Sequence, residues 1–153
     1  MIQIFLMRHA HYSPIPGKSH SECPIDTIGQ SQCAEVAKQI KQLGLNFNIG
    51  FCSDLQRGQD TLAQLQSNGV NFGTLKTYAY NQYIHTSAIL SLLKSEVADN
   101  QTVLWVGHNP NLETLYYDLT GEDLFFDYCK GVLLNFEEGI KPPKGIKITV
   151  IQP

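Results

Sequence analysis

Residues 2–11 are IQIFLMRHAH, an apolar run that ends abruptly in an arginine and two histidines. The run Ile2–Met7 is rich in β-branched and aromatic side chains and is too short for an ordinary helix, so it predicts a buried strand. Arg8, His9 and His11 follow at the carboxyl end of that strand. Three ionisable side chains directly after a buried strand predict both the class of fold and the position of the functional site.

Outward from this stretch, strand-like and helix-like patterns alternate along the chain. The residues favour further strands at 49–52, 75–80, 102–106, 132–136 and 147–151, and helices at 29–43, 54–67, 86–97 and 110–119. The segment 11–24 is rich in proline, glycine and serine and predicts a loop. Ser53 and Thr86 are the expected N-caps of their helices, Gly44 is the expected stop of the first, and Pro110 suits a first helical turn.

This alternation predicts an α/β fold: a single three-layer domain over residues 1–153, with a largely parallel central sheet and helices on both faces. No internal repeat, low-complexity tract or linker interrupts the chain. In such folds, ligands bind beyond the carboxyl ends of the strands. We therefore expect the functional side chains to lie directly after strands.

The composition narrows the class of protein. The chain has 153 residues, 42% of them hydrophobic and 16% charged, and a formal net charge of -3. That balance gives no support for binding to nucleic acid or to an anionic membrane, because either needs clustered positive charge. The apolar run 2–7 is shorter than the ~7–15 residues of a signal-peptide core, and no run approaches the ~20 of a membrane span. The four cysteines form no C-x-x-C pair, so we expect reduced thiols and a cytoplasmic protein.

Both arginines of the chain, Arg8 and Arg57, lie at predicted strand-to-helix junctions, whereas every other basic residue apart from the histidines is a lysine. Arginine is a planar, permanently charged donor that can bind two oxygens of one anion, which lysine cannot do. The third junction carries His108 and Asn109, directly after the strand 102–106. Two arginines and two histidines are therefore expected at one edge of one sheet.

Phosphoryl transfer is the chemistry that suits this set. Arg8 and Arg57 can neutralise the charge on the equatorial phosphoryl oxygens. A neutral imidazole such as that of His9 is a competent nucleophile, and His108 can donate to the transferring oxygens. Because the arginines supply the positive charge, no metal or cofactor is required.

Four segments occur in order along the chain: RHA (8–10), PIDTIG (24–29), SDLQRGQDT (53–61) and GHNP (107–110). They resemble the Arg-His-Gly, Pro-Leu-Thr-x-x-Gly, Ser-Pro-x-x-Arg-Ala-x-x-Thr and Gly-His-x-Pro segments of the histidine phosphatase superfamily, which includes the cofactor-dependent phosphoglycerate mutases. The short chain is most similar to the SixA-type phosphohistidine phosphatases of that superfamily. Asp26, Asp54 and Gly58 depart from the usual residues. Asp26 suits the N-cap of the helix that follows it.

The resemblance implies a two-step mechanism. His9 attacks phosphorus and becomes a phosphohistidine, Arg8, Arg57 and His108 hold the phosphoryl oxygens, and water then hydrolyses the intermediate. The implied substrate is a phosphorylated protein, in particular a phosphohistidine on a phosphotransfer domain, or else a small phosphorylated metabolite.

The residue that donates a proton to the leaving group in many family members has no carboxylate counterpart in this chain. Many members carry a glutamate where this chain has YNQYIH (80–85), with Asn81 in place of a carboxylate. An alkoxide leaving group needs such an acid, whereas a phosphohistidine whose ring is protonated leaves as neutral imidazole. The gap therefore favours a phosphoramidate substrate, although His11 and His85 are alternative acids. We expect His11, Asn81 and Asn109 to contact substrate.

Other classes of function stay open at this point. His9-x-His11 after a strand has the spacing of a two-histidine metal site, but that reading leaves both arginines without a role. A small-molecule phosphomonoesterase of the same superfamily is one alternative, and a phosphate-binding regulatory module without turnover is another. Nothing in the sequence forbids a monomer.

Overall fold

The computed structural model describes all residues, 1–153, and arranges them in six strands and four α-helices. The strands are β1 (Ile2–Arg8), β2 (Phe47–Ser53), β3 (Phe72–Tyr78), β4 (Thr102–Gly107), β5 (Gly131–Phe136) and β6 (Ile146–Ile151), and the α-helices are α1 (Thr27–Gln42), α2 (Gln56–Ser67), α3 (Thr86–Glu96) and α4 (Asn111–Thr120). Two single 3-10 turns, η1 (His20–Glu22) and η2 (Tyr80–Gln82), lie in the connections.

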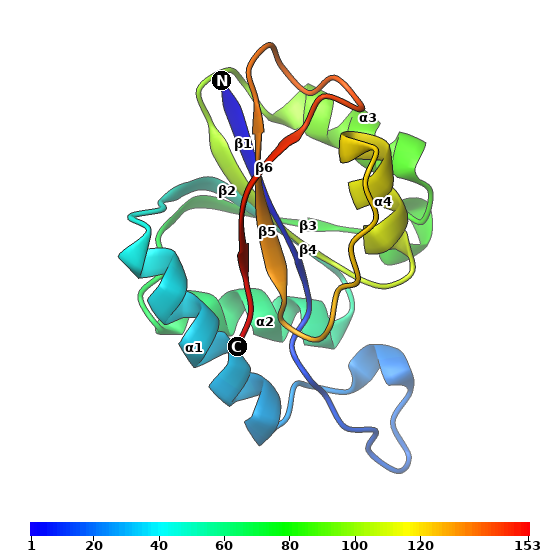
Figure 1. Ribbon diagram of the computed structural model, residues 1–153. Helices are drawn as coiled ribbons and strands as arrows, with labels where there is room; N and C mark the ends of the chain where they lie inside the picture. The colour runs from blue at the N-terminus through cyan, green and yellow to red at the C-terminus, as the bar shows by residue number, and fades with distance from the viewer.

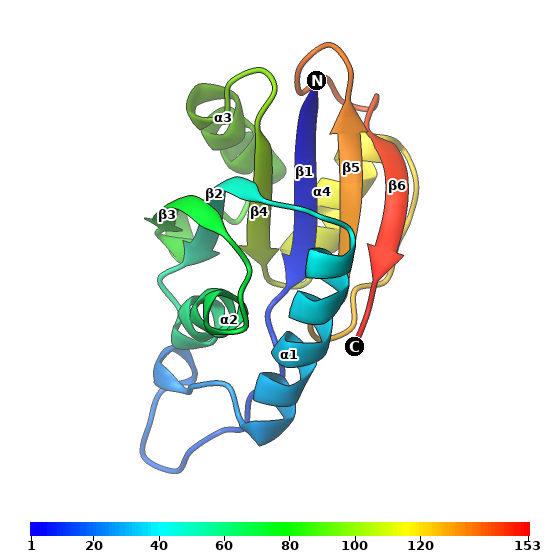
Figure 2. The same cartoon turned by 90° about the vertical axis from the view of Figure 1, so that its left-hand side faces the viewer.

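All six strands join one sheet in the order β3-β2-β4-β1-β5-β6. β1 pairs in parallel with β4, in the register Phe5 to Leu104, and β2 pairs in parallel with both β3 and β4. β5 runs antiparallel to β1 and to β6, as its opposed arrow in Figure 2 shows. The parallel strands β1, β2 and β4 therefore end at one edge of the sheet, side by side.

Helices cover both faces of the sheet (Figures 1 and 2). One apolar cluster packs α1 and α2 against one face around Phe5, Val36 and Leu104. The other cluster packs α3 and α4 against the opposite face around Trp105, Leu115 and Phe136. β1 alternates between the two, since Ile4 and Leu6 belong to one cluster and Phe5 and Met7 to the other. A strand buried on both faces has the continuous apolar run seen in residues 2–7.

The predicted fold class is confirmed: one α/β domain with a mostly parallel sheet between helical layers. Each expected helix and strand is present, with ends that differ by a few residues. The helix expected from 29 begins at Thr27, because the Asp26 side chain accepts a hydrogen bond from the Gly29 N–H at 2.9 Å and caps it. Gly44 has a φ of 68°, the left-handed conformation that favours glycine after a helix.

Two N-cap predictions were wrong. Ser53 is the last residue of β2, and α2 begins at Gln56 rather than at residue 54. The Ser53 hydroxyl is committed to a buried imidazole, described below, and accepts only the Leu55 N–H at 3.2 Å. Thr86 is the first residue inside α3, and the residue at the N-cap is His85, which makes no capping bond through its side chain.

The segments that connect the strands bring the candidate functional residues to the carboxyl ends of β1, β2 and β4. The segment 9–26 leaves the end of β1 and hangs below the sheet beside α1 and α2 (Figure 2). The segment 121–130 returns from α4 to the same edge, where the Arg8 N–H donates to the Lys130 carbonyl at 3.1 Å. None of the four helices combines the length and the apolar character needed to cross a membrane.

Candidate active site

His9 is buried, with 3% of its surface exposed, directly after β1. Its Nδ1 lies 2.8 Å from the Ala10 carbonyl oxygen. A carbonyl only accepts hydrogen bonds, so Nδ1 carries the proton and Nε2 presents its lone pair. Burial, joined by the charges of Arg57 and Arg8 and opposed by the Ala10 bond, lowers the pKa of His9 from 6.5 to about 4. The ring is therefore neutral and nucleophilic at physiological pH.

The turn after His9 is tied to α2. The Ala10 N–H donates to Thr61 Oγ1 at 2.9 Å, and that hydroxyl donates in turn to the Arg57 carbonyl at 2.7 Å. Gly29 of α1 packs closely against the same turn: a Cβ at that position would lie 2.2 Å from the His11 carbonyl oxygen. The helices α1 and α2 thus hold the segment 9–11 from both sides.

His108 follows β4, and its ring centroid lies 5.0 Å from that of His9. Burial, the neighbouring His9 and the two arginines lower the pKa of His108, so this ring is neutral as well. Its Nε2 lies 2.6 Å from Ser53 Oγ, a hydroxyl with no exposed surface. Its Nδ1 is buried and has no hydrogen-bond partner.

The hydrogen bonds of Ser53 fix the tautomer of His108. Ser53 Oγ accepts the Leu55 N–H, and His108 Nε2 is its one available acceptor. If the hydroxyl donates to Nε2, then every polar atom of Ser53 is satisfied, and the proton of the neutral imidazole resides on Nδ1. The opposite tautomer leaves a buried hydroxyl hydrogen without an acceptor, which costs about 1–3 kcal/mol. His108 therefore presents a free N–H donor.

Arg8 stacks on an aromatic ring and bonds one backbone carbonyl. Its Cζ lies 3.9 Å from the centroid of the Tyr128 ring, and its Nη1 donates to the Phe126 carbonyl at 3.4 Å. The Tyr128 ring also makes an edge contact with His9, at 5.8 Å between centroids. These contacts orient the guanidinium beside the nucleophile.

Arg57 makes the same two kinds of contact as Arg8, with other partners. Its Cζ lies 4.6 Å from the centroid of the Tyr12 ring, and its Nη1 donates to the His20 carbonyl at 2.9 Å. Tyr12 makes an edge contact with His9 at 5.7 Å. The bond to His20 anchors the segment 12–22 across this side of the site.

Unpartnered donors converge on this part of the molecule. Five buried side-chain polar atoms of the chain have no hydrogen-bond partner, and three of them are donors that belong to the residues around His9: Arg8 Nε, Arg57 Nε and His108 Nδ1. A buried donor without a partner is costly, so three together indicate a site for an anion with several acceptor oxygens. This arrangement matches a phosphoryl group.

The segment 121–130 contributes contacts that sequence patterns missed. Cys129 has a φ of 61°, and its N–H donates to the His9 carbonyl at 3.1 Å. Asn109 Nδ2 donates at 2.9 Å to the Phe126 carbonyl, the same oxygen that Arg8 binds. The amide donor of Asn109 is thus used to hold this segment, and its Oδ1 is buried without a partner.

His11 lies beside the site and forms a polar pair with Asp26. Its Nδ1 is 2.6 Å from Asp26 Oδ2, and its ring centroid is 4.9 Å from that of Tyr128. The side chain of His11 is 31% exposed and that of Asp26 is 20% exposed. Tyr128 therefore contacts Arg8, His9 and His11 at once.

Asn81 is not brought to the histidines by any contact. It is exposed in the turn η2, and its neighbour Tyr80 packs edge-on against the His108 ring at 5.0 Å instead. His85 is also exposed, at the start of α3. No spacing rule pointed to Tyr12, Tyr80 or Tyr128. The one available signal was a tyrosine directly after the His9-x-His11 pair, and it applies to Tyr12 alone.

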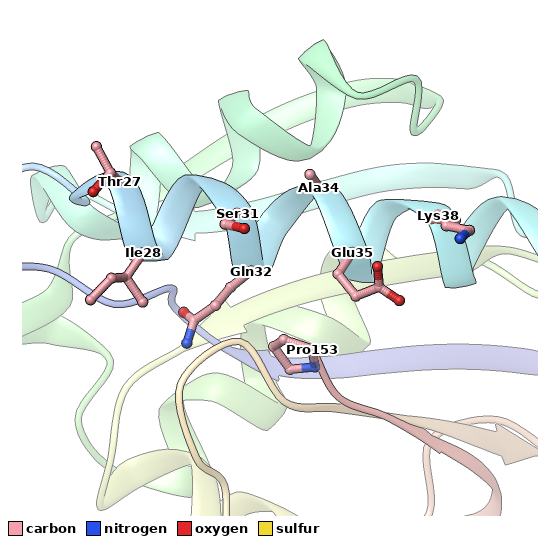
Figure 3. Close-up of a pocket in the computed structure, with 8 residues that line it drawn as sticks. All are labelled: Thr27, Ile28, Ser31, Gln32, Ala34, Glu35, Lys38 and Pro153. Carbon is pink, nitrogen blue, oxygen red and sulfur yellow. The ribbon is translucent and has the colours of Figure 1, made fainter.

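The largest groove on the surface is separate from the paired histidines. Figure 3 shows it along the outer side of α1, about 800 Å³ in volume, with Pro153 opposite the helix. Gln32 lines this groove, and its Oε1 also accepts the His11 N–H at 2.9 Å. The groove therefore adjoins the rim of the site at His11 and contains none of its arginines.

Metal-ligating side chains are not grouped in this structure: no cluster of three or more His, Cys, Asp or Glu residues could hold an ion. The two histidines of the His9-x-His11 motif have separate partners at Nδ1, the Ala10 carbonyl and the Asp26 carboxylate.

The family model of the histidine phosphatase superfamily (branch 1) matches residues 4–76, which include His9 and Arg57. The amino-terminal part of the chain, just under half of its length, is therefore similar to this superfamily. Among its curated relatives are an uncharacterized chloroplastic protein of Arabidopsis thaliana, 25% identical over 145 residues, and the 2,3-bisphosphoglycerate-dependent phosphoglycerate mutase 1 of Nitrosomonas europaea, 39% identical over 56 residues. These alignments cover 86% and 35% of this chain, and they span 65% and 24% of the relatives' own lengths.

Several solved structures share the whole fold of this chain. A protein described as a phosphohistidine phosphatase SixA from Agrobacterium tumefaciens superposes with a TM-score of 0.83 at 20% identity, over 99% of this chain and 97% of that one. The protein histidine phosphatase SixA in complex with tungstate gives 0.79 at 19% identity, over 98% and 96%. Phosphoserine phosphatase from Entamoeba histolytica gives 0.67 at 16%, over 100% and 98%. At these identities the superpositions establish the SixA-like fold.

Proposed function

We propose that this protein is a phosphatase that hydrolyses its substrate through a phosphohistidine intermediate on His9. The observation that carries the proposal is the position of three buried, unpartnered N–H donors around a neutral imidazole whose Nε2 is free to attack. The donors belong to Arg8, Arg57 and His108. The match of residues 4–76 to the histidine phosphatase superfamily supports the same reaction.

In the first step, the lone pair on His9 Nε2 forms a bond to phosphorus while the bond from phosphorus to the leaving group breaks. The Ala10 carbonyl accepts a hydrogen bond from the Nδ1–H, so its oriented dipole stabilises the positive charge that develops on the ring. The two guanidinium groups and the His108 N–H bind the equatorial oxygens as their charge is redistributed.

In the second step, water attacks phosphorus and the electron pair of the N–P bond returns to Nε2. The neutral state of His9 is restored because its lowered pKa disfavours retention of a second proton. Positive charge from Arg8 and Arg57 serves both steps, so the mechanism that we propose uses no metal and no cofactor.

For the substrate, we propose a phosphohistidine on a protein such as a phosphotransfer domain. Two solved structures of the same fold are described as phosphohistidine phosphatases of the SixA type. The segment 80–85 carries no carboxylate, which suits a leaving group that departs as neutral imidazole. The segment 12–22 is short, so little of the chain stands between the site and a protein surface.

A small phosphorylated metabolite is the second candidate, which the fold shared with a phosphoserine phosphatase favours. A regulatory module that binds phosphate without turnover is the third, and Asn81 in place of an acid permits it. We further propose that the protein acts as a monomer in the cytoplasm, without nucleic-acid or membrane partners, in keeping with its net charge of -3.

A panel of substrates tests the proposal. Initial rates would be compared for a phosphohistidine-bearing phosphotransfer domain, O-phosphoserine, a sugar phosphate and p-nitrophenyl phosphate, each with and without a chelator. We expect the highest kcat/KM with the phosphohistidine protein and no effect of the chelator. A higher kcat/KM with an alkyl phosphate contradicts the proposed substrate class. Binding of tungstate without turnover of any substrate indicates the regulatory module.

A further inference from the structure

We infer that His11 and Asp26 form a proton-donating pair at the leaving-group side of the site, so that the enzyme also expels strongly basic leaving groups such as alkoxides. This inference rests on the phosphatase function proposed above. It assigns to His11 the protonation of the leaving group, because the segment 80–85 has no carboxylate that could do this.

The geometry of the pair carries the inference. Asp26 Oδ2 lies 2.6 Å from His11 Nδ1, a distance typical of a strong, charge-assisted hydrogen bond. A carboxylate only accepts, so the Nδ1 proton is directed at Asp26, and Nε2 is the nitrogen available to exchange a proton with a ligand. A carboxylate behind an imidazole orients the ring and fixes which nitrogen faces the ligand.

The environment keeps Asp26 ionised. Although partial desolvation acts in the opposite direction, hydrogen bonds from the Ser13 hydroxyl, the Gly29 N–H and His11 lower the pKa of Asp26 below its usual value. The carboxylate is therefore available to His11 at physiological pH. Its second oxygen is committed to the cap of α1, which fixes the pair relative to the helix.

The pair lies close to the nucleophile, with the Tyr128 ring in contact with both. The centroid of that ring is 5.8 Å from that of His9 and 4.9 Å from that of His11. The His11 backbone is held by Gln32, whose Oε1 accepts its N–H. His11 is partly exposed while His9 is buried, so His11 lies at the rim, where a leaving group departs toward solvent.

The proton balance closes over the two steps. As the bond from phosphorus to the leaving oxygen breaks, that oxygen takes the electron pair and the proton of His11 Nε2. His11 is then neutral, with its Nδ1 proton still on the bond to Asp26. When water attacks the phosphohistidine, its proton passes to His11 Nε2, the N–P electron pair returns to His9, and the starting state is restored.

Leaving-group basicity is the variable that tests this role. Single-turnover phosphorylation of His9 would be measured with p-nitrophenyl phosphate, which releases a weakly basic phenolate, and with O-phosphoserine, which releases an alkoxide. The variants are His11→Asn and Asp26→Asn, the second of which keeps a good N-cap. His85→Asn is the matched histidine control, and thermal melting reports the folding of each variant.

We expect His11→Asn to slow phosphorylation by phosphoserine about 100-fold and phosphorylation by the aryl phosphate less than about threefold, because general acid catalysis contributes most to the poorest leaving groups. Asp26→Asn should show the same selectivity with a smaller loss, about tenfold. An equal loss with both donors, no loss, or the selective loss in His85→Asn overturns the inference. So does a wild-type protein that labels at His9 from the aryl phosphate but never from phosphoserine. A wild type that labels from no donor at all overturns the proposed function itself.

Discussion

The Nε2 atom of His108 lies 2.6 Å from the hydroxyl oxygen of Ser53, at the point where β2 and β4 end side by side. This bond places the imidazole proton on Nδ1, the nitrogen that has no partner within the protein. Ser53 thereby turns a buried, neutral histidine into a directed donor. The residue that the sequence suggested as a helix cap is instead the positioning group for a candidate phosphate ligand.

Replacement of Ser53 by alanine should leave His108 with a choice of tautomers. We expect Ser53→Ala to lower kcat about tenfold, because the buried Nε2 then competes for the single proton. Nitrogen NMR of the histidine rings in the resting protein checks this, because a purely structural role of Ser53 would not change the ring tautomer. The proton of His108 should be on Nδ1 in the wild type and shared between Nδ1 and Nε2 in the variant. Ser95→Ala, on the exposed side of α3, is the control and should match the wild type. An unchanged ring spectrum in Ser53→Ala would falsify this assignment.

The Tyr128 ring should act on Arg8 through its face rather than its hydroxyl. Tyr128→Phe preserves the ring 3.9 Å from the guanidinium carbon and should retain most of the wild-type kcat/KM. Tyr128→Ala removes the stacked face and should lower kcat/KM about tenfold, in line with a cation–π contact of about 1–2 kcal/mol. Equal losses in the two variants would show that the hydroxyl, and not the stacking, matters.

Lysine should not replace either arginine. Arg8→Lys and Arg57→Lys keep a positive charge but lose the Nε donor and the planar fork. We expect each variant to reduce kcat/KM about 100-fold, with melting temperatures close to that of the wild type. Near-wild-type rates in both lysine variants would mean that net charge suffices and that the unpartnered Nε groups bind no substrate oxygen.

Acid should destabilise the fold through the buried neutral histidines. The pKa of His9 is about 4 in the folded state, against 6.5 for an ordinary histidine, which represents the unfolded chain. Between these values the unfolded state binds more protons, so stability is present above pH 6.5 and is lost as the pH falls through this window. His9 alone should cost roughly 2 kcal/mol between pH 7 and pH 5.

Urea unfolding at a series of pH values measures this slope. His9→Asn should flatten it, whereas His85→Asn, at an exposed position, should leave it unchanged. The same pH dependence in the wild type and in His9→Asn would show that other groups control acid stability.

The sequence predicted the residues that lie at strand ends, because one geometric rule brings those ends together. Arg8 is the last residue of β1, His9 and His108 directly follow the parallel strands β1 and β4, and Arg57 follows β2 after a short turn. Parallel strands that are buried on both faces have recognisable apolar runs, so their carboxyl ends could be located before the fold was known.

The contacts of the segment 121–130 could not be predicted in this way. After α4 the chain crosses back to the edge where β1 ends, so β5 runs antiparallel, with Gly131 opposite Met7. Periodicity reveals that a strand exists but not its direction. The return of this irregular segment is also what delivers Tyr128 and the Phe126 carbonyl to Arg8, a pairing across more than a hundred residues that no local pattern encodes.

Trapping of the phosphorylated protein tests the central claim most directly. The wild type would be mixed with a phosphohistidine protein or p-nitrophenyl phosphate, quenched in alkali to preserve phosphoramidates, and mapped by mass spectrometry beside His9→Ala and His108→Ala. We predict phosphate on His9 in the wild type, a weaker label in His108→Ala, and neither label nor turnover in His9→Ala. Continued turnover by His9→Ala, or a label on any other residue of the wild type, would contradict the account.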